Sequence, residues 1–381
     1  MWRKWLPEAG ILVVLAILGV GIYSNALQNG FHYDDLHHIV KNPHIRALNN
    51  IPSFFTDPET FSLKYKIYLH YRPLVMVSYA LNYHFGKLNP AGYHLVNLSF
   101  HTGTAFLVFL ILQAMVGSRI PPNPPLVKGG MGGFFAAVAA GMIFLTTPFN
   151  SEVVNYISAR SSVMCTFFYL LAFYCWVKFR QEKIEVRSQK FETSGQTASY
   201  FLPLTSIFYL ASLLAFLLAM LTKEIAITLP AMLFLYDIYF GRKRVKSPDG
   251  KRVILHLYVP YLLPLGIGIA YFLVRILFYG NAVVLNYREG TYEHFLLEIK
   301  VLIKYITMMI FPAGLSVKHY VPGGDSIGDP EIFFSYLILV GIGALAYLCY
   351  KSGWVSLRIV SFFILWFFIT HIPTSVIPLT A

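Results

Sequence analysis

The chain has 381 residues and a formal net charge of +12, and it is 56% hydrophobic but only 13% charged. A soluble globular domain carries about 25% charged residues, so this composition excludes an ordinary soluble enzyme. Apolar runs of about 20 residues, the length at which a helix crosses roughly 30 Å of hydrocarbon, recur along the sequence. The sequence therefore predicts an all-α, polytopic integral membrane protein with about 9–10 spans.

The positive charge falls in short segments between the apolar runs. These segments are the N-terminus and residues 118–132, 178–190 and 242–252. Their placement follows the positive-inside rule, which indicates cytoplasmic loops and argues against a nucleic-acid partner.

The three cysteines all lie within apolar runs, where they are typical small hydrophobic residues.

The apolar runs predict ten helices, at 8–27, 93–117, 133–149, 159–178, 202–221, 225–240, 256–278, 297–313, 331–350 and 354–371. The first run resembles a signal peptide, but its length and the runs that follow favour a retained signal anchor. The charges in run 297–313 also allow an interfacial or re-entrant helix. That alternative reverses the side reached by the C-terminus, and positive-inside counting slightly favours it.

Residues 28–92 form the first loop expected outside the membrane, together with the turns near 149–160, 222–224 and 279–296. Its aromatic and apolar stretches predict a structured loop, with an amphipathic helix over 74–83 that starts at Arg72-Pro73. We expect one transmembrane domain over 1–381 that carries this loop, and no separate soluble domain.

Two adjacent carboxylates, Asp34 and Asp35, follow the first apolar run. A carboxylate at the mouth of an apolar cavity can accept a proton from an attacking hydroxyl. The simpler alternative is a solvated loop or an Asx turn after Asn29-Gly30. Their position on the first outer loop favours an active site.

The second apolar run carries His94, Asn97 and His101, which share one helical face. Polar groups within a membrane are costly and usually face a cavity or a partner. A divalent metal bound by Asp34 or Asp35 with His37 or His38 is an alternative, although no compact metal-ligand motif is present, and the sequence predicts no other cofactor.

Charged residues also occur at two other outer turns. Glu152, Tyr156 and Arg160 are spaced four apart, so they are expected to line one helical face, where Arg160 could bind phosphate. A Glu152–Arg160 ion pair is an equally good interpretation. Lys223 and Glu224 lie between two apolar runs and are either solvated or able to reach a lipid phosphate.

The sequence lacks a phosphate-binding loop, a dinucleotide-binding glycine pattern and a Gly-x-Ser-x-Gly elbow. It also lacks the paired broken helices that would point towards a transporter. These observations argue against an enzyme that uses a nucleotide.

An ordered series of motifs runs from about residue 25 to the end of the chain: Phe31-His-Tyr-Asp-Asp35, Tyr71-Arg-Pro-Leu74, Gly92-Tyr-His-Leu-Val-Asn97 with His101, Pro148 with Glu152 and Arg160, Lys223-Glu224 with Tyr236-Asp237, and Pro373-Thr-Ser375. This series resembles the transmembrane and tetratricopeptide-repeat O-mannosyltransferase family, and more broadly the GT-C membrane glycosyltransferases. Family members usually continue into helical repeats, whereas this chain stops at Ala381. The segment Ser316-Val-Lys-His-Tyr320 has Lys-His where the family leads us to expect an acidic residue.

The resemblance implies an inverting transfer of mannose or another hexose from a polyprenyl- or dolichyl-phosphate carrier to a protein or glycan hydroxyl on the extracytoplasmic side. Asp34 or Asp35 would be the base. The residues implied to line the donor site are Arg72, His94, Asn97, His101, Glu152, Arg160, Lys223 and Glu224. Short loops and the lack of eukaryotic sorting signals favour a bacterial inner membrane. The alternative is a non-catalytic transporter, flippase or scaffold for lipid-linked sugars.

Overall fold

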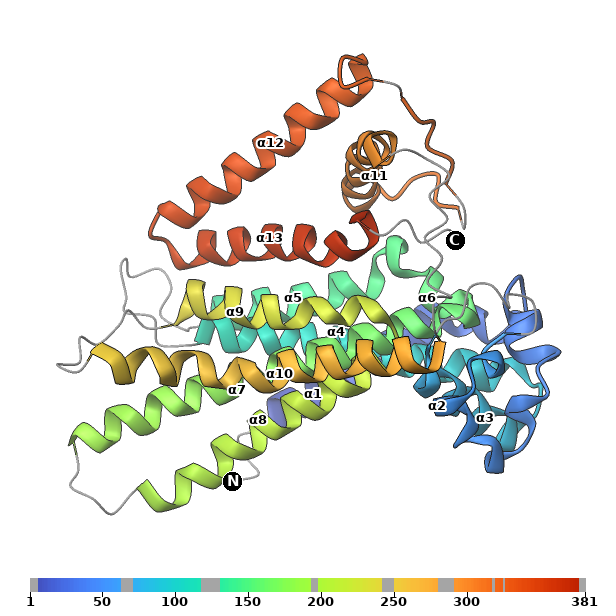
Figure 1. Cartoon of the computed structure of the whole chain (residues 1–381), viewed down its shortest axis with the longest axis horizontal. Helices are drawn as coiled ribbons and strands as arrows, with labels where there is room; N and C mark the ends of the chain where they lie inside the picture. The colour runs from blue at the N-terminus through green and yellow to red at the C-terminus, as the bar shows by residue number, and fades with distance from the viewer. Residues whose placement is uncertain are drawn as a thin grey trace. The chain divides into compact units, whose positions relative to one another are not determined.

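The structure, a computed structural model, describes residues 6–62, 71–117, 131–192, 198–241, 250–279, 291–316, 319–324 and 326–376. Most of the basic segments 118–132 and 242–252 lies outside these residues. The described residues form helices and connecting loops, with no strand among them (Figure 1). The chain divides into two compact units, Met1–Thr146 with Val153–Val283 and Thr147–Glu152 with Val284–Ala381.

Each of the ten apolar runs coincides with a helix, which confirms an all-α polytopic membrane fold. They are α1 (Leu6–Tyr23), α4 (Pro90–Gly117), α5 (Met131–Thr146), α7 (Arg160–Glu192), α8 (Ala198–Met220), α9 (Leu229–Phe240), α10 (Gly250–Tyr279), α11 (Thr291–Ile310), α12 (Pro330–Lys351) and α13 (Val355–Val376). Within the described ranges, α1, α4, α7, α10, α12 and α13 are long and apolar enough to cross a membrane. A seventh span results if α5 and the bent segment after it count as one.

In the first unit, α4 packs against α1, α5 and α7, while α7 packs against α8 and α9. The described part of the first loop lies at one end of this bundle, where α2 (Ser53–Thr56) and α3 (Pro73–Gly86) are seen (Figure 1). The backbone N–H of Leu74 donates to the Leu221 carbonyl at 3.2 Å, and the Tyr271 hydroxyl donates to the Tyr71 carbonyl at 3.3 Å. The first loop is therefore tied to the 221–224 turn and to α10.

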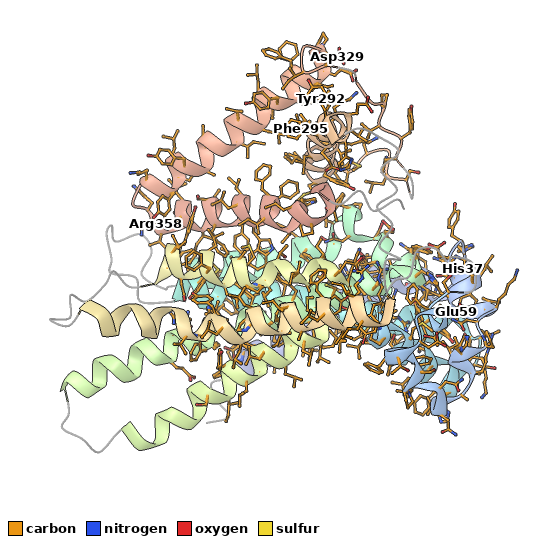
Figure 2. All side chains as sticks on the ribbon, viewed as in Figure 1. His37, Glu59, Tyr292, Phe295, Asp329 and Arg358 are labelled. Carbon is orange, nitrogen blue, oxygen red and sulfur yellow. The ribbon has the colours of Figure 1, made fainter. Side chains whose placement is uncertain are left out.

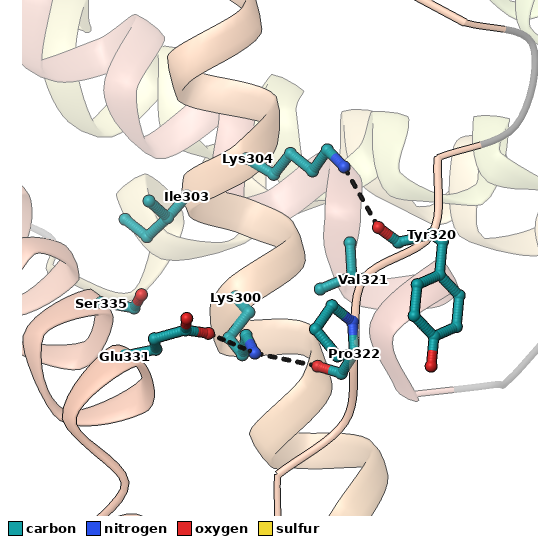
Figure 3. A pocket seen from close by; sticks show the side chains of 8 residues that line it. All are labelled: Lys300, Ile303, Lys304, Tyr320, Val321, Pro322, Glu331 and Ser335. Atoms are coloured by element: carbon teal, nitrogen blue, oxygen red, sulfur yellow. Dashed lines mark hydrogen bonds and ion pairs between the residues drawn. The ribbon is translucent and has the colours of Figure 1, made fainter.

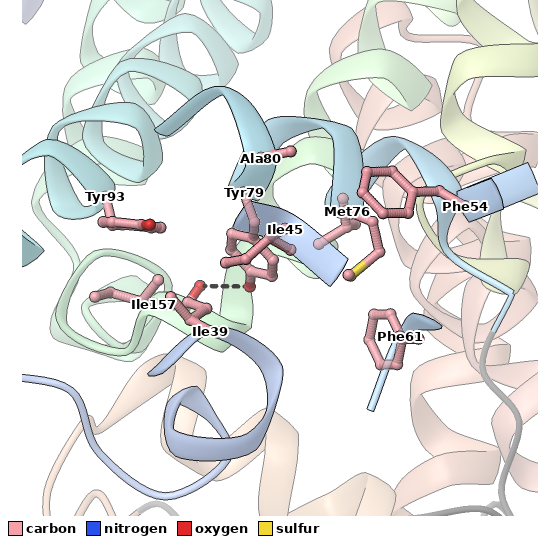
Figure 4. Packing of buried hydrophobic residues seen from close by; sticks show 10 residues of the cluster. Ile39, Ile45, Phe54, Phe61, Met76, Tyr79, Ala80, Tyr93 and Ile157 are labelled. Carbon is pink, nitrogen blue, oxygen red and sulfur yellow. Dashed lines mark hydrogen bonds between the residues drawn. The ribbon is translucent and has the colours of Figure 1, made fainter. Parts of the chain in front are cut away.

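The first loop is structured by its own buried cluster, as its apolar stretches predict. Figure 4 shows this cluster, in which α3 and the short helical turns Leu36–Val40 and His44–Arg46 pack together. Its buried members are Ile39, Ile45, Phe54, Phe61, Val75, Met76, Tyr79, Ala80, Tyr93 and Ile157. Burying one Val, Ile, Phe or Met side chain contributes about 1.5–3 kcal/mol, and seven of the ten members are of these types, so the cluster holds the loop firmly against α4.

The segment between α5 and α7 differs from the expected continuous helical face. A 3₁₀ turn at Pro148–Asn150 is followed by the one-turn helix α6 (Glu152–Asn155) and another 3₁₀ turn at Ile157–Ala159. Tyr156 has an extended backbone between the last two. The prediction that Glu152, Tyr156 and Arg160 share one face is therefore wrong, because the helix breaks between them.

The second unit contains α11, α12 and α13, with α12 packed against both of the others. Leu296 and Ile299 of α11 are buried against Ile332 of α12. Among the described residues, α11 is the most amphipathic long helix, and it is not among the helices apolar enough to span. This favours the interfacial alternative, while the side reached by the C-terminus stays a prediction.

Candidate active site

Asp34 is the accessible member of the carboxylate pair. Its side chain is 46% exposed, and its Oδ1 lies 3.0 Å from Nε2 of His37. The Asp34 N–H donates to the Tyr156 hydroxyl at 3.3 Å. Burial alone raises the pKa of Asp34, but hydrogen bonds from His37 and Tyr156 and the charges of His38 and His37 outweigh it and lower the pKa below its usual value. Asp34 is therefore an ionised carboxylate with one side open.

Asp35 lies in the opposite environment, with only 1% of its surface exposed. Its Oδ1 accepts from the Ser158 N–H at 2.8 Å and from the Ser158 hydroxyl at 2.5 Å, and its Oδ2 accepts from the His32 N–H at 3.0 Å. Burial raises the pKa of Asp35, and these hydrogen bonds only partly offset it. Asp35 thus joins the first loop to the segment before α7.

Two buried histidines, His37 and His38, help to orient the Asp34 and Asp35 carboxylates. His37 and His38 are both buried, and their rings lie 4.4 Å apart. Nδ1 of His37 lies 3.0 Å from the Ser62 hydroxyl, so Ser62, His37 and Asp34 form one hydrogen-bonded chain. Nδ1 of His38 lies 3.3 Å from the Ser158 hydroxyl. Figure 2 shows His37 on this loop at one end of the first unit.

Arg72, Lys223 and Glu224 form a second charged group at the same end of the bundle. An Arg72 guanidinium nitrogen lies 3.6 Å from Oε1 of Glu224, and Lys223 donates to the Ser162 hydroxyl at 2.9 Å. The Phe61 ring connects this group to the histidines: its centroid is 4.5 Å from the His38 ring and 5.7 Å from the Arg72 guanidinium carbon. These residues come from two separate loops and converge on one region.

Arg160 is fully buried and is not an exposed phosphate ligand. Its Nε donates to Oδ1 of Asn97 at 2.8 Å, and its Nη2 donates to the Tyr93 carbonyl at 2.7 Å. Its Nη1 donates to Ser78 and to Oδ1 of Asn82. The guanidinium therefore joins α3, α4 and α7, and the alternative of a Glu152–Arg160 ion pair does not match these contacts.

The polar face of α4 binds the backbone of the broken segment. Nδ1 of His94 lies 2.8 Å from the Val154 carbonyl, Nδ2 of Asn97 lies 2.9 Å from the Val153 carbonyl, and Nε2 of His101 lies 3.2 Å from the Leu145 carbonyl. Helix ends leave carbonyls without an intrahelical partner, and these carbonyls need other donors. The face expected to meet a cavity or a partner therefore meets the backbone of the chain itself.

Glu152 is exposed at the start of α6 and belongs to the second unit. The described contacts do not join it to Asp34, so its role as a donor-binding residue stays a prediction. Across the described ranges, no group of three or more His, Cys, Asp or Glu side chains is arranged to hold a metal ion.

Sequence reasoning did not single out Ser62 or Ser158, which bind His37 and Asp35. Neither belongs to a recognisable spacing, because their partners are brought together only by folding. One local signal does mark the region: Tyr33 has a positive φ of 49° and is 69% exposed beside Asp34. Lys87, which is not part of the site, has a similar φ of 51°, so this conformation alone does not identify a functional residue.

Fold and site together define a helical membrane protein with an open carboxylate on a structured surface loop. The chain is similar to protein O-mannosyl-transferase TMTC2 of Mus musculus, with 28% identity over 238 residues, which is 62% of this chain and 25% of the relative. Tmtc1 of Drosophila melanogaster is 32% identical over 157 residues (40% and 16%), and TMTC4 of Homo sapiens is 26% identical over 248 residues (61% and 30%).

These similarities confirm the resemblance to the transmembrane and tetratricopeptide-repeat O-mannosyltransferase family. The chain spans about a quarter of the length of the curated relatives it matches. No family model matches the chain, and no solved structure matches it.

Proposed function

We propose that this protein is a glycosyltransferase that moves mannose or another hexose from a polyprenyl- or dolichyl-phosphate carrier to a hydroxyl of a protein or glycan. The carrier would lie in the bilayer, with transfer on the extracytoplasmic side of a bacterial inner membrane. The relatives are named protein O-mannosyl-transferases, which supports sugar transfer. The observation that carries the proposal is the half-exposed Asp34 carboxylate, whose neighbour His38 is connected through the Phe61 ring to Arg72 of the Arg72, Lys223 and Glu224 group.

Asp34 is the proposed base, because it is the member of the pair that a substrate can reach. The acceptor hydroxyl attacks the anomeric carbon, the bond from that carbon to the phosphate oxygen breaks, and the hydroxyl proton passes to Asp34. The lipid phosphate leaves with the bonding electrons, so no nucleotide is consumed. A carboxylate with a low pKa is a weak base, but it suffices when the proton moves late, as the new bond forms.

His37, Ser62 and Asp35 are proposed as positioning residues. His37 orients the Asp34 carboxylate through their 3.0 Å contact, and Ser62 fixes the His37 ring. Asp35 fixes the loop to Ser158. Pre-organised groups of this kind avoid reorganisation during the reaction.

Charge that develops on the departing phosphate needs a cation, and Arg72 and Lys223 are the proposed candidates. Both are tethered at the end of the bundle where the outer loops meet. Arg160 already donates to four groups inside the protein, so we assign it to the frame that supports the site. Ordered cations of this type act by electrostatic stabilisation.

The test is release of free polyprenyl phosphate from a panel of polyprenyl-phosphate sugars by the purified chain, measured by mass spectrometry. Asp34→Asn should lower release about 10²- to 10⁴-fold. Glu59→Gln is the matched control, since Glu59 is an exposed carboxylate on the same loop and should leave release unchanged. Wild-type release from Asp34→Asn would refute this mechanism. Binding of lipid-linked sugars with no release would favour a transporter, flippase or scaffold.

A further inference from the structure

Outside the carboxylate site, the second unit contains a pocket of about 360 Å³ between α11, α12 and residues 320–322. Figure 3 shows two lysines of α11, Lys300 and Lys304, entering it from one helix face. Lys300 lies 2.8 Å from the Glu331 carboxylate and donates to the Pro322 carbonyl at 2.9 Å. Lys304 donates to the Tyr320 carbonyl at 3.3 Å. The pocket therefore concentrates ammonium groups in a defined geometry.

The lining carries a net positive charge. Lys300 and Lys304 contribute two positive charges and Glu331 one negative charge, so the described lining residues sum to +1. An ammonium has three N–H donors, and the carbonyl contact of Lys304 uses one of them. The remaining donors can bind a phosphate oxygen, and the net positive charge favours an anionic ligand. The phosphodiester of a phospholipid head group is such an anion.

The surroundings of the pocket suit a lipid. Ile303, Val321 and Pro322 add apolar lining beside the lysines. The helix α11 is amphipathic, and its Tyr292 and Phe295 are 54% and 53% exposed (Figure 2). Amphipathic helices with basic residues and exposed aromatic residues lie at the boundary between head groups and acyl chains.

We propose that this pocket binds the phosphodiester head group of an anionic bilayer phospholipid. The Lys304 ammonium contacts the phosphate, Lys300 supports it while paired with Glu331, and the acyl chains lie along the exposed apolar residues of α11. The site anchors α11 at the membrane surface. The proposal concerns binding alone and does not depend on sugar transfer.

The test is native mass spectrometry of the purified full chain with added phosphatidylglycerol, with phosphatidylcholine as the zwitterionic comparison. Lys304→Gln removes the charge but can still donate to the Tyr320 carbonyl, so it should weaken phosphatidylglycerol binding about fivefold. Glu331→Gln should strengthen binding, because it removes the opposing charge. Lys351→Gln, at the exposed end of α12, is the matched control and should bind as the wild type does.

Opposite effects of Lys304→Gln and Glu331→Gln on binding would support the proposal, since lysines that merely fasten the 320–322 segment would not produce them. Unchanged binding in Lys304→Gln, or equal binding of both phospholipids, would overturn it. Displacement by millimolar inorganic phosphate would show a free-anion site and overturn the lipid assignment, as would a clear preference for polyprenyl phosphate. Asp34→Asn should bind phosphatidylglycerol normally, which separates this test from that of the proposed enzyme.

Discussion

The adjacent aspartates should separate into one residue needed for turnover and one needed for stability. Asp35→Ala leaves two backbone donors, the N–H groups of His32 and Ser158, without their acceptor. Each unsatisfied buried donor costs about 1–3 kcal/mol, which gives a total of about 2–6 kcal/mol. The Ser158 hydroxyl is not counted, because it can turn to Nδ1 of His38, 3.3 Å away.

The expected loss lies near the lower end, about 2–3 kcal/mol, because Asp35→Ala also removes a carboxylate whose burial disfavours the charged form. Asp34 is 46% exposed, and an exposed pair such as Asp34–His37 contributes only about 0–1 kcal/mol. Asp34→Asn should therefore leave stability nearly unchanged. Its turnover should fall about 10²- to 10⁴-fold, the usual effect of removing a general base.

The assay compares thermal unfolding in detergent, followed by intrinsic fluorescence, with release of polyprenyl phosphate per folded molecule. Asp35→Ala should unfold at a clearly lower temperature than wild type, and Asp34→Asn should not. The reasoning is refuted if Asp34→Asn unfolds as early as Asp35→Ala, or if Asp35→Ala is as stable as the wild type.

Three further predictions follow from the same contacts. Folding lowers the pKa of Asp34, so its stabilising contribution is present above its unfolded pKa of about 3.9 and is lost as pH falls through the lower folded value. In a pH profile of kcat/KM, release should therefore not depend on Asp34 protonation down to about pH 4. His37→Gln should move that limit upwards, because it removes a hydrogen bond that lowers the pKa of Asp34. Arg160→Ala leaves several buried acceptors unpaired and should lower stability by at least about 3 kcal/mol in the same unfolding assay, a result contradicted by a wild-type midpoint. Asp237→Ala leaves Arg180, whose side chain is 17% exposed, without its carboxylate and should cost about 3 kcal/mol, the lower end for a broken buried pair, while release per folded molecule stays at the wild-type level.

Local patterns in the sequence predict much of the fold. Apolar run length alone predicts the ten helices, because a membrane-spanning segment must satisfy its backbone hydrogen bonds internally and bury its side chains in hydrocarbon. Arg72-Pro73 predicts the start of α3 because proline suits the first helical turn. The gap between two apolar runs predicts the turn near 149–160, but not the extended backbone at Tyr156 within it, since Tyr156 and its neighbours carry no strong helix-breaking residue.

The sequence by itself also determined that two carboxylates follow the first span, on a loop rich in histidine. Only the tertiary structure decided that Asp34 is open and Asp35 buried, because that difference comes from Ser158, which lies 123 positions from Asp35 along the chain. Only the tertiary structure likewise decided the role of Arg160. Its planar guanidinium could bind a phosphate, but its donors are already hydrogen-bonded to groups of α3 and α4. Residue type sets what a side chain can do, whereas burial and partners, which arise from distant segments, set what it does.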